Sequence, residues 1–174
     1  MTYSVVLAAT SYRIYAFFYA KQYPSIAIES LFIIQSNFFD FENHMIDHLD
    51  HLVLTTANEQ DCIDFYTRVL GMQLDIFLAG NPAIERKAFK FKNQKINLHI
   101  KGKEFEPKAD LPTPGSLDLC FIADRPLVDV IAKLEKEQWP IIEGPVIRTG
   151  ATAKINSVYL RDPDNNLIEI SEIL

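Results

Sequence analysis

The chain has 174 residues and a formal net charge of −6, from 23 acidic and 17 basic side chains. A composition that is 48% hydrophobic and 23% charged is typical of one globular domain or two small modules, and it excludes a disordered chain. The acidic excess argues against a nucleic-acid-binding protein. The two cysteines, Cys62 and Cys120, exclude a disulfide-stabilised scaffold and indicate a reducing, cytoplasmic compartment.

Residues 1–44 differ in composition from the rest of the chain. They hold 11 of the 20 aromatic residues but only five charged side chains. No basic region of a signal peptide precedes the first apolar run, and Arg13, Lys21 and Pro24 interrupt that run, so a spanning helix is not expected. We interpret 1–44 as an extension from an upstream start codon, with the folded domain covering 45–174; an interfacial anchor is the alternative.

The first half of the domain predicts one strand, one helix and three further strands. Thr56-Ala-Asn-Glu59 has the form of a capping box, so we expect it to begin the helix. Apolar residues then recur at helical spacing up to Gly71, which is a typical helix end. The expected strands are His48–Thr55, Leu74–Leu78, Ala88–Phe91 and Lys95–Ile100.

A linker with three prolines, 101–115, precedes a second run of the same elements. Asp124 is the expected cap of its helix, with Pro126 in the first turn. Before the last strand, Asp162–Asn166 has the residue types of a tight turn in which Asn165 or Asn166 takes a positive φ. The expected strands are Ser116–Ala123, Pro140–Ile142, Val146–Ile147, Asn156–Arg161 and Leu167–Ser171.

The repeated order of elements predicts the fold class. Module one, 46–105, and module two, 116–174, each follow the order βαβββ, which indicates an internal duplication. We therefore expect an α+β protein in which two βαβββ modules form a cupped mixed sheet around a central cleft.

Polar residues in four strands indicate a metal site. Successive strand residues alternate between the two faces of a sheet, so a polar residue between apolar neighbours points away from the core. The first and the last strand of each module each contain one such residue that can bind a metal, which gives four candidates. Two histidines and two carboxylates suit a divalent Zn, Fe, Mn, Ni or Co ion. The candidate metal ligands are His51, His99, Asp118 and Glu169.

Three segments carry a family resemblance. They are His51-Leu-Val-Leu, Phe65-Tyr-Thr-Arg-Val-Leu-Gly-Met72 and Arg161-Asp-Pro-Asp-Asn-Asn-Leu-Ile-Glu169. Through these segments the chain resembles members of the vicinal oxygen chelate superfamily, which includes glyoxalase I, bleomycin-resistance proteins and extradiol dioxygenases. The stretch from Ile96-Asn-Leu-His99 to Pro114-Gly-Ser-Leu-Asp118 is most similar to the glyoxalase domain-containing protein 5 group.

The resemblance implies a homodimer with a metal in each cup, held by the first and last strands of each module. His51 and Glu169 match the pattern. Asp118 stands where the family usually has His. The place of the fourth ligand falls on Asn97 or His99, depending on the alignment.

The function implied is that of a metal-dependent lyase or isomerase, similar to lactoylglutathione lyase, that acts on a small oxygen-rich or thiol-conjugated substrate. Glu169 is the expected catalytic base. Arg148 and Lys154 are candidates to bind an anionic substrate, because they flank a glycine-containing loop. The alternatives are a non-catalytic small-molecule-binding protein of the bleomycin-resistance type, or a thiol transferase or dioxygenase of the same superfamily. No nucleic acid or membrane partner is expected.

Overall fold

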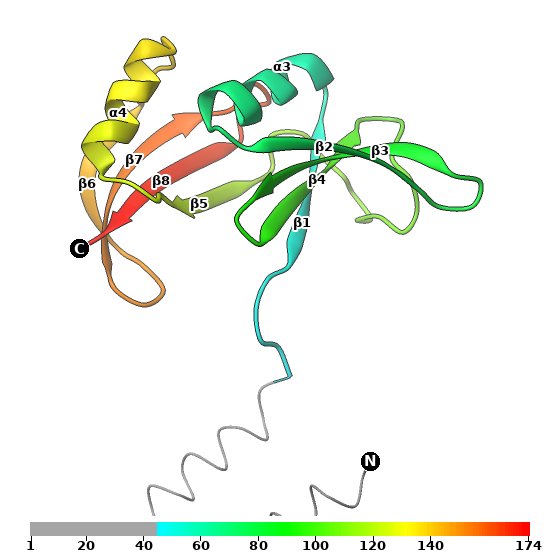
Figure 1. Ribbon diagram of the computed structural model, residues 1–174, viewed down its shortest axis with the longest axis horizontal. Helices are drawn as coiled ribbons and strands as arrows, with labels where there is room; N and C mark the ends of the chain where they lie inside the picture. Colours follow the sequence, from blue (N-terminus) through cyan, green and yellow to red (C-terminus); the bar gives the residue numbers. More distant parts are fainter. Residues whose placement is uncertain (1–44) are drawn as a thin grey trace, which may run out of the picture. The chain divides into compact units, whose positions relative to one another are not determined.

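The computed structural model describes residues 45–174, so the expectations for 1–44 lie outside the described residues. Leu49–Leu174 forms one compact unit. Figure 1 shows the two helices of this unit on one side of its strands. Neither helix is both long enough and apolar enough to cross a membrane.

Module one contains a four-stranded mixed sheet. Its elements are β1 (His51–Thr56), α3 (Glu59–Asp64) with the π-helical turn Phe65–Val69, β2 (Gln73–Ala79), β3 (Ile84–Phe91) and β4 (Gln94–Ile100). The strand order is β1-β4-β3-β2, with β1 parallel to β4 and the other pairs antiparallel.

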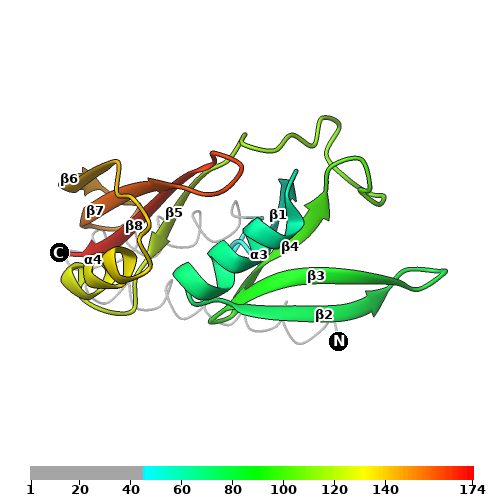
Figure 2. The same cartoon turned by 90° about the horizontal axis from the view of Figure 1, so that it is seen from above.

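Module two repeats this arrangement. Its elements are β5 (Asp118–Ile122), α4 (Leu127–Lys136), β6 (Glu143–Thr149), β7 (Lys154–Arg161) and β8 (Leu167–Ile173). The order β5-β8-β7-β6 has the same parallel and antiparallel pairs as module one. The predicted α+β fold with two βαβββ modules is confirmed, and Figure 2 shows the linker leaving β4 and running to β5.

The helix-covered faces of both sheets share one hydrophobic core. Leu54 and Ile96 of module one and Val158 and Ile168 of module two are completely buried in it. Each of these side chains alternates along its strand with a residue on the opposite, open face. The open faces therefore carry the polar residues that the sequence singled out.

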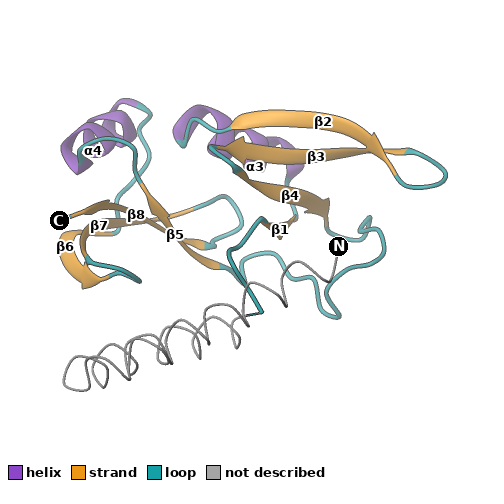
Figure 3. Cartoon of the chain, turned by 60° about the horizontal axis from the view of Figure 1, so that its bottom comes forward, coloured by secondary structure: helices purple, strands orange, loops and turns teal. Residues whose placement is uncertain are grey.

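Aromatic contacts join the two modules beside this core. The ring of Phe65 lies 4.8 Å from that of Trp139, and Phe91 meets Phe121 edge to face at 5.6 Å. Arg68 also forms an ion pair with Glu137 across the junction. The modules therefore pack through their helical sides, away from the open faces of the sheets (Figure 3).

The expected helix caps are wrong in both modules. Asn58, not Thr56, caps α3, because its side-chain oxygen accepts a hydrogen bond from the Asp61 amide. Asp124 does not cap α4 either; it pairs with Arg125, and the Leu127 amide instead donates to the Glu172 carboxylate at 2.8 Å. A residue of the last strand thus supplies the cap, which local spacing cannot reveal.

Two details of the expected elements also change. Pro140–Ile142 is not a strand: β6 begins at Glu143 and contains a bulge at the Gly144–Pro145 bond. At the predicted tight turn, Asn165 has the positive φ, at 68°. The neighbouring Asn166 is buried, and its side-chain oxygen accepts a hydrogen bond from the Leu117 amide at 2.8 Å.

Candidate functional site

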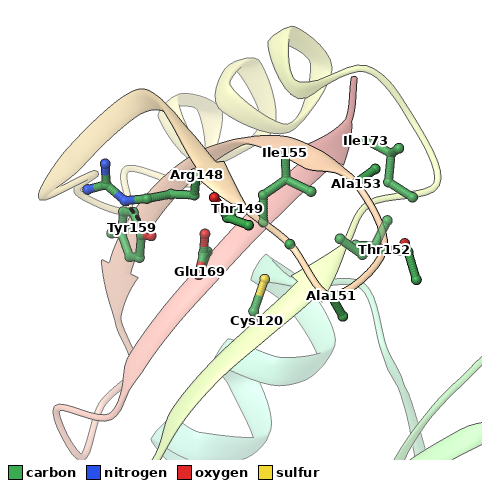
Figure 4. A pocket seen from close by; sticks show the side chains of 12 residues that line it. Cys120, Arg148, Thr149, Ala151, Thr152, Ala153, Ile155, Tyr159, Glu169 and Ile173 are labelled. Carbon is green, nitrogen blue, oxygen red and sulfur yellow. Dashed lines mark hydrogen bonds between the residues drawn. The ribbon is translucent and has the colours of Figure 1, made fainter.

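A cavity of about 510 Å³ lies on the open face of module two. This volume is within the range of small-molecule sites in proteins. The loop from Thr149 to Ala153, which joins β6 and β7, arches over one side of the cavity (Figure 4). The side chains that line the floor come from three adjacent strands and include Cys120, Tyr159 and Glu169.

The strand register explains why these side chains meet. Cys120 of β5 and Tyr159 of β7 are both paired with Glu169 of β8, so the three side chains stand in one row across the sheet. Their neighbours along the strands, such as Ile168 and Val158, point into the core. Parity and register together thus place a carboxylate, a phenol and a thiol at the centre of the cavity.

Hydrogen bonds hold Glu169 in its ionised form. Desolvation acts to raise the pKa of this carboxyl, but hydrogen bonds from neighbouring side chains outweigh it and lower the pKa below its usual value. The Ser171 hydroxyl donates to Glu169 Oε1 at 3.4 Å, and it is itself 2.8 Å from the Ser157 hydroxyl. The side chains responsible are Ser157, Tyr159, Cys120 and Ser171.

Arg148 is joined to this row through Tyr159. Its Nε donates to the Tyr159 hydroxyl at 3.2 Å, and its guanidinium lies 5.5 Å from the centre of the same ring. The other end of the guanidinium pairs with Glu143. Desolvation and Glu169 raise the pKa of Tyr159 despite the effect of Arg148, so the phenol keeps its proton at neutral pH.

The two other predicted site residues of module two lie at the periphery. Asp118 is exposed on β5, on the same face as Cys120, but it is not part of the cavity lining. Lys154 begins β7 opposite Thr149 and does not line the cavity either. Of the two predicted substrate-binding residues, the structure brings Arg148 alone to the cavity.

The two histidines predicted as metal ligands lie at opposite ends of the open face of module one. His51 is paired with Lys95 and Thr55 with His99 in the parallel β1–β4 ladder. The histidines are therefore offset by four residues, about 13 Å along the strands. Asn97 is paired with Val53 and lies nearer His51; its buried side-chain oxygen has no hydrogen-bond partner.

The predicted ligands do not form a metal site within one chain. No group of three or more histidine, cysteine, aspartate or glutamate side chains in residues 45–174 has the geometry to hold an ion. His51 is 44% exposed and its ring contacts the neighbouring Asp50, 2.6 Å away. The donors that residues 45–174 of one chain bring together thus do not fit a resident metal.

Sequence reasoning missed three residues of the site, Ser157, Tyr159 and Ser171. The signal was present in β7, where Ser157 and Tyr159 alternate with Val158 and Leu160. Neutral hydroxyl groups are not among the usual ligands of divalent transition metals, so a pattern of metal-binding residues does not include them. Ser171 follows Glu169 by two residues and shares its face for the same reason.

Comparison with known proteins identifies relatives over most of the described region. The model of the Glyoxalase/Bleomycin resistance protein/Dioxygenase superfamily matches residues 48–170. Virulence protein STM3117 of Salmonella typhimurium is 52% identical over 128 residues, which are 74% of this chain and 85% of that protein. Glyoxalase domain-containing protein RDO1 of Mycosarcoma maydis is 54% identical over 123 residues, 71% of this chain and 66% of that protein.

Solved structures agree with these matches. The crystal structure of the Salmonella typhimurium protein superposes with a TM-score of 0.70 and 51% identity, over 75% of this chain and all of that chain. The structure of lactoylglutathione lyase from Agrobacterium tumefaciens superposes with a TM-score of 0.56 over 73% of this chain and 94% of that chain. Its identity is 21%, so this second likeness concerns the fold alone.

Proposed function

The chain belongs to the glyoxalase/bleomycin resistance protein/dioxygenase superfamily, and we propose that it is a lyase or isomerase acting on a small oxygen-rich or thiol-conjugated substrate in the module-two cavity. One observation carries this proposal: the Glu169 carboxylate is held ionised on the floor of an open cavity, beside a protonated phenol that an arginine contacts. A base beside a proton donor is the arrangement that proton transfer between neighbouring carbons requires.

In this proposal Glu169 removes a proton from the carbon next to a carbonyl group. The carboxylate is ionised at neutral pH before substrate enters. A substrate that displaces water from the cavity raises the basicity of Glu169, because desolvation penalises its charged form. The proton is then returned to the adjacent carbon from the same oxygen, and the hydroxyl proton of the first carbon passes to the oxygen of the second; these two transfers together complete the isomerisation.

Arg148 and Tyr159 would bind the oxygen on which negative charge develops. The Tyr159 phenol keeps its proton and accepts a hydrogen bond from the Nε of Arg148, so on substrate binding it can turn its single O–H from Glu169 to an anionic oxygen of the substrate. The guanidinium also supplies positive charge at the same side of the cavity.

We propose that the protein is a homodimer, for two structural reasons. β1 and β5 each have a hydrogen-bonded neighbour on one side only, so both sheets end in an open edge within the described residues. The open faces also expose apolar side chains, including Val53, Ile122 and Ile173. Covering such edges and patches is a common result of self-association. Light scattering after size-exclusion chromatography measures the mass directly, and a monomer at micromolar concentration would contradict this part.

Metal analysis of the same sample decides whether a metal belongs to the assembled protein. We propose that His51 and Glu169 are its main ligands and that Asn97, His99 and Asp118 compete for the remaining positions. Because these residues do not converge within one chain, binding would require the assembly. A transition metal near one per chain that is lost in both His51→Ala and Glu169→Ala supports the assignment. Equal metal content in all three proteins contradicts it.

The second candidate function is a non-catalytic small-molecule-binding protein. The apolar wall of the cavity, formed by Ile122, Ile155 and Ile173, favours it, because such a wall binds ligand without chemistry. Glu169→Gln separates the two functions. The variant keeps the size of the side chain, so a binding protein should retain its ligand whereas an enzyme should lose turnover.

The activity test uses the hemithioacetal of glutathione and a small 2-oxoaldehyde, with thioester formation as the readout. Glu169→Gln should lower kcat by about 10²- to 10⁴-fold, the usual contribution of a general base. Glu135→Gln, on an exposed turn of α4, is the matched control and should leave kcat unchanged. Undiminished turnover by Glu169→Gln would refute the catalytic role of this carboxylate.

A further inference from the structure

The strand β2 forms an open edge of the module-one sheet. Among the described residues it has a hydrogen-bonded neighbour, β3, on one side only, and Figure 2 shows it along the outer margin of module one. Its ladder with β3 runs over the whole strand without a register shift. The backbone N–H and C=O groups on its free side therefore form a regular row to which a further strand can hydrogen-bond.

The corresponding edge of module two is protected against such pairing, whereas β2 is not. The edge strand β6 contains a bulge between Glu143 and Val146, the proline Pro145 and the charged Arg148. Bulges, prolines and charged side chains are the devices with which natural proteins block an edge strand. The sequence of β2 is Gln-Leu-Asp-Ile-Phe-Leu-Ala, which has no proline and one charged residue, Asp75. An unprotected edge of this kind indicates a partner strand.

Exposed apolar side chains lie beside the free edge of β2. Leu74, Ile76 and Leu78 alternate along the strand on its helix-covered face, because Leu74 is paired with the buried Phe89 of β3. Leu74 contacts the hydrophobic core, but Ile76 is 53% exposed and Leu78 is 73% exposed. A partner strand with apolar residues at matching positions would bury both side chains, and each cross-strand pair stabilises the contact by about 0.2–1 kcal/mol.

We propose that a second copy of this chain supplies the partner strand, with the two β2 strands antiparallel and Ile76 of one copy opposite Ile76 of the other. This register places Leu74 of each copy opposite Leu78 of the other, so the apolar residues of both strands meet on one face. A two-fold axis through the central pair uses the same surface on both copies and leaves neither β2 edge free. The four-stranded module-one sheets of the two copies then form one continuous sheet.

The charges along β2 favour this partner and this register. Asp75, which pairs with Lys90 at 2.9 Å, would lie opposite Phe77 of the second copy. The Lys95 ammonium lies 5.2 Å from the centre of the Phe77 ring, so each Asp75 carboxylate approaches a lysine of the other copy. A shift of the register by two residues would instead bring the two Asp75 side chains directly opposite each other, which is unfavourable for like charges.

This contact is separate from the homodimer proposed above, which covers the β1 and β5 edges and the open faces. β2 lies at the opposite end of the module-one sheet from β1. A strand of seven residues offers much less contact than a standard interface, so we expect a dissociation constant on the order of 100 µM. The contact joins two of whatever species is present at low micromolar concentration, and it does not depend on the proposed chemistry at Glu169.

Light scattering of the full-length chain measures this association. Between about 5 µM and about 200 µM the mean mass of the wild type should rise by about half. Ile76→Lys places two lysines opposite each other and should weaken the association by about tenfold, as should Leu78→Lys, so that the mass rises by less than about a quarter. Val128→Lys, at a 68% exposed apolar position of α4, is the matched control and should behave as the wild type. A constant wild-type mass, or a rise that Ile76→Lys leaves unchanged, overturns the proposal.

Cysteine cross-linking tests the register, in a Cys120→Ser background because Cys62 is buried. Ile76→Cys should form a disulfide between two copies, since opposite residues of antiparallel strands have Cβ atoms about 4.5–5.5 Å apart. Leu74→Cys should not, because its two copies are offset by about 13 Å, but it should cross-link when mixed with Leu78→Cys. Equal cross-linking of Ile76→Cys and Leu74→Cys overturns the register. No cross-link in Ile76→Cys overturns the second copy as the partner and is the result expected if another protein occupies the edge.

Discussion

The Tyr66 hydroxyl donates a hydrogen bond of 3.1 Å to the Asp162 carboxylate, and both residues are buried at the junction of the two modules. The same carboxylate accepts hydrogen bonds from the Asn166 amide at 2.8 Å and from its side-chain nitrogen at 2.7 Å. Asp162 therefore fixes the turn before β8 to the helix of module one. Because β8 carries Glu169, this contact helps to position the proposed base.

Tyr66→Phe should destabilise the protein by about 1–3 kcal/mol, since it removes one of the two donors to Oδ2 of a buried carboxylate and leaves that oxygen with the Asn166 side chain alone. Urea unfolding followed by circular dichroism measures the loss. Tyr159→Phe is the matched control, because Tyr159 lies on an open sheet face rather than between the modules. A loss for Tyr66→Phe no larger than that of the control would show that the hydrogen bond between the modules contributes little.

The stability of the protein should depend on pH through Asp162. Desolvation raises the pKa of this carboxyl in the folded state although hydrogen bonds from Asn166 and Tyr66 oppose it. The folded state thus binds the proton more tightly than the unfolded state, whose pKa is about 3.9. The contribution of Asp162 is fully present below that value and is lost as pH rises through the folded pKa.

Comparison with Asp162→Asn isolates this effect. As pH is lowered from about 7 to 4, the free energy of unfolding of the wild type should rise relative to that of the variant. Asp110→Asn, at an exposed position of the linker, should show no such relative change. A difference between wild type and Asp162→Asn that is constant or falls toward acid pH is incompatible with a raised pKa.

Glu172→Gln should test the cap of α4. Glu172 Oε2 accepts a hydrogen bond from the Leu127 amide at 2.8 Å, and its negative charge lies at the positive end of the helix. Loss of the charge should cost about 0.5–1 kcal/mol, and Glu172→Ala about 1–2 kcal/mol. Asp124→Ala, which removes the residue that local spacing favoured, should cost less than Glu172→Ala in the same thermal unfolding experiment.

Gly150→Ala should impair the module-two cavity. A Cβ at this position would lie 2.8 Å from the Ala153 carbonyl oxygen and 3.0 Å from Ile155 Cγ2, so the loop over the cavity must move. We expect kcat/KM for the hemithioacetal to fall by about tenfold, a loss of about 1.4 kcal/mol in transition-state stabilisation. Ala151→Gly is the control in the same loop. Unchanged kinetics in Gly150→Ala would show that this loop does not contact the substrate.

Strand parity is the part of the site that could be predicted from sequence. His51, Asn97, His99 and Glu169 lie on the open faces because alternation along a strand is a local property of the backbone. The duplicated order of elements likewise predicted the two modules, since each element depends on its own periodicity and end signals. Membership of the superfamily was also predicted from sequence, because three short segments in the strands, the first helix and the last turn carry the resemblance.

Register and long-range contacts were decided by the tertiary structure alone. The four-residue offset between His51 and His99 follows from how β1 aligns with β4, and no residue within either strand specifies that alignment. Glu172 caps α4 from 45 positions away, and Tyr159 joins Arg148 to Glu169 only because β6, β7 and β8 are neighbours. Sequence periodicity determines which face a side chain occupies, whereas only the packing of separate strands and helices determines which side chains meet there.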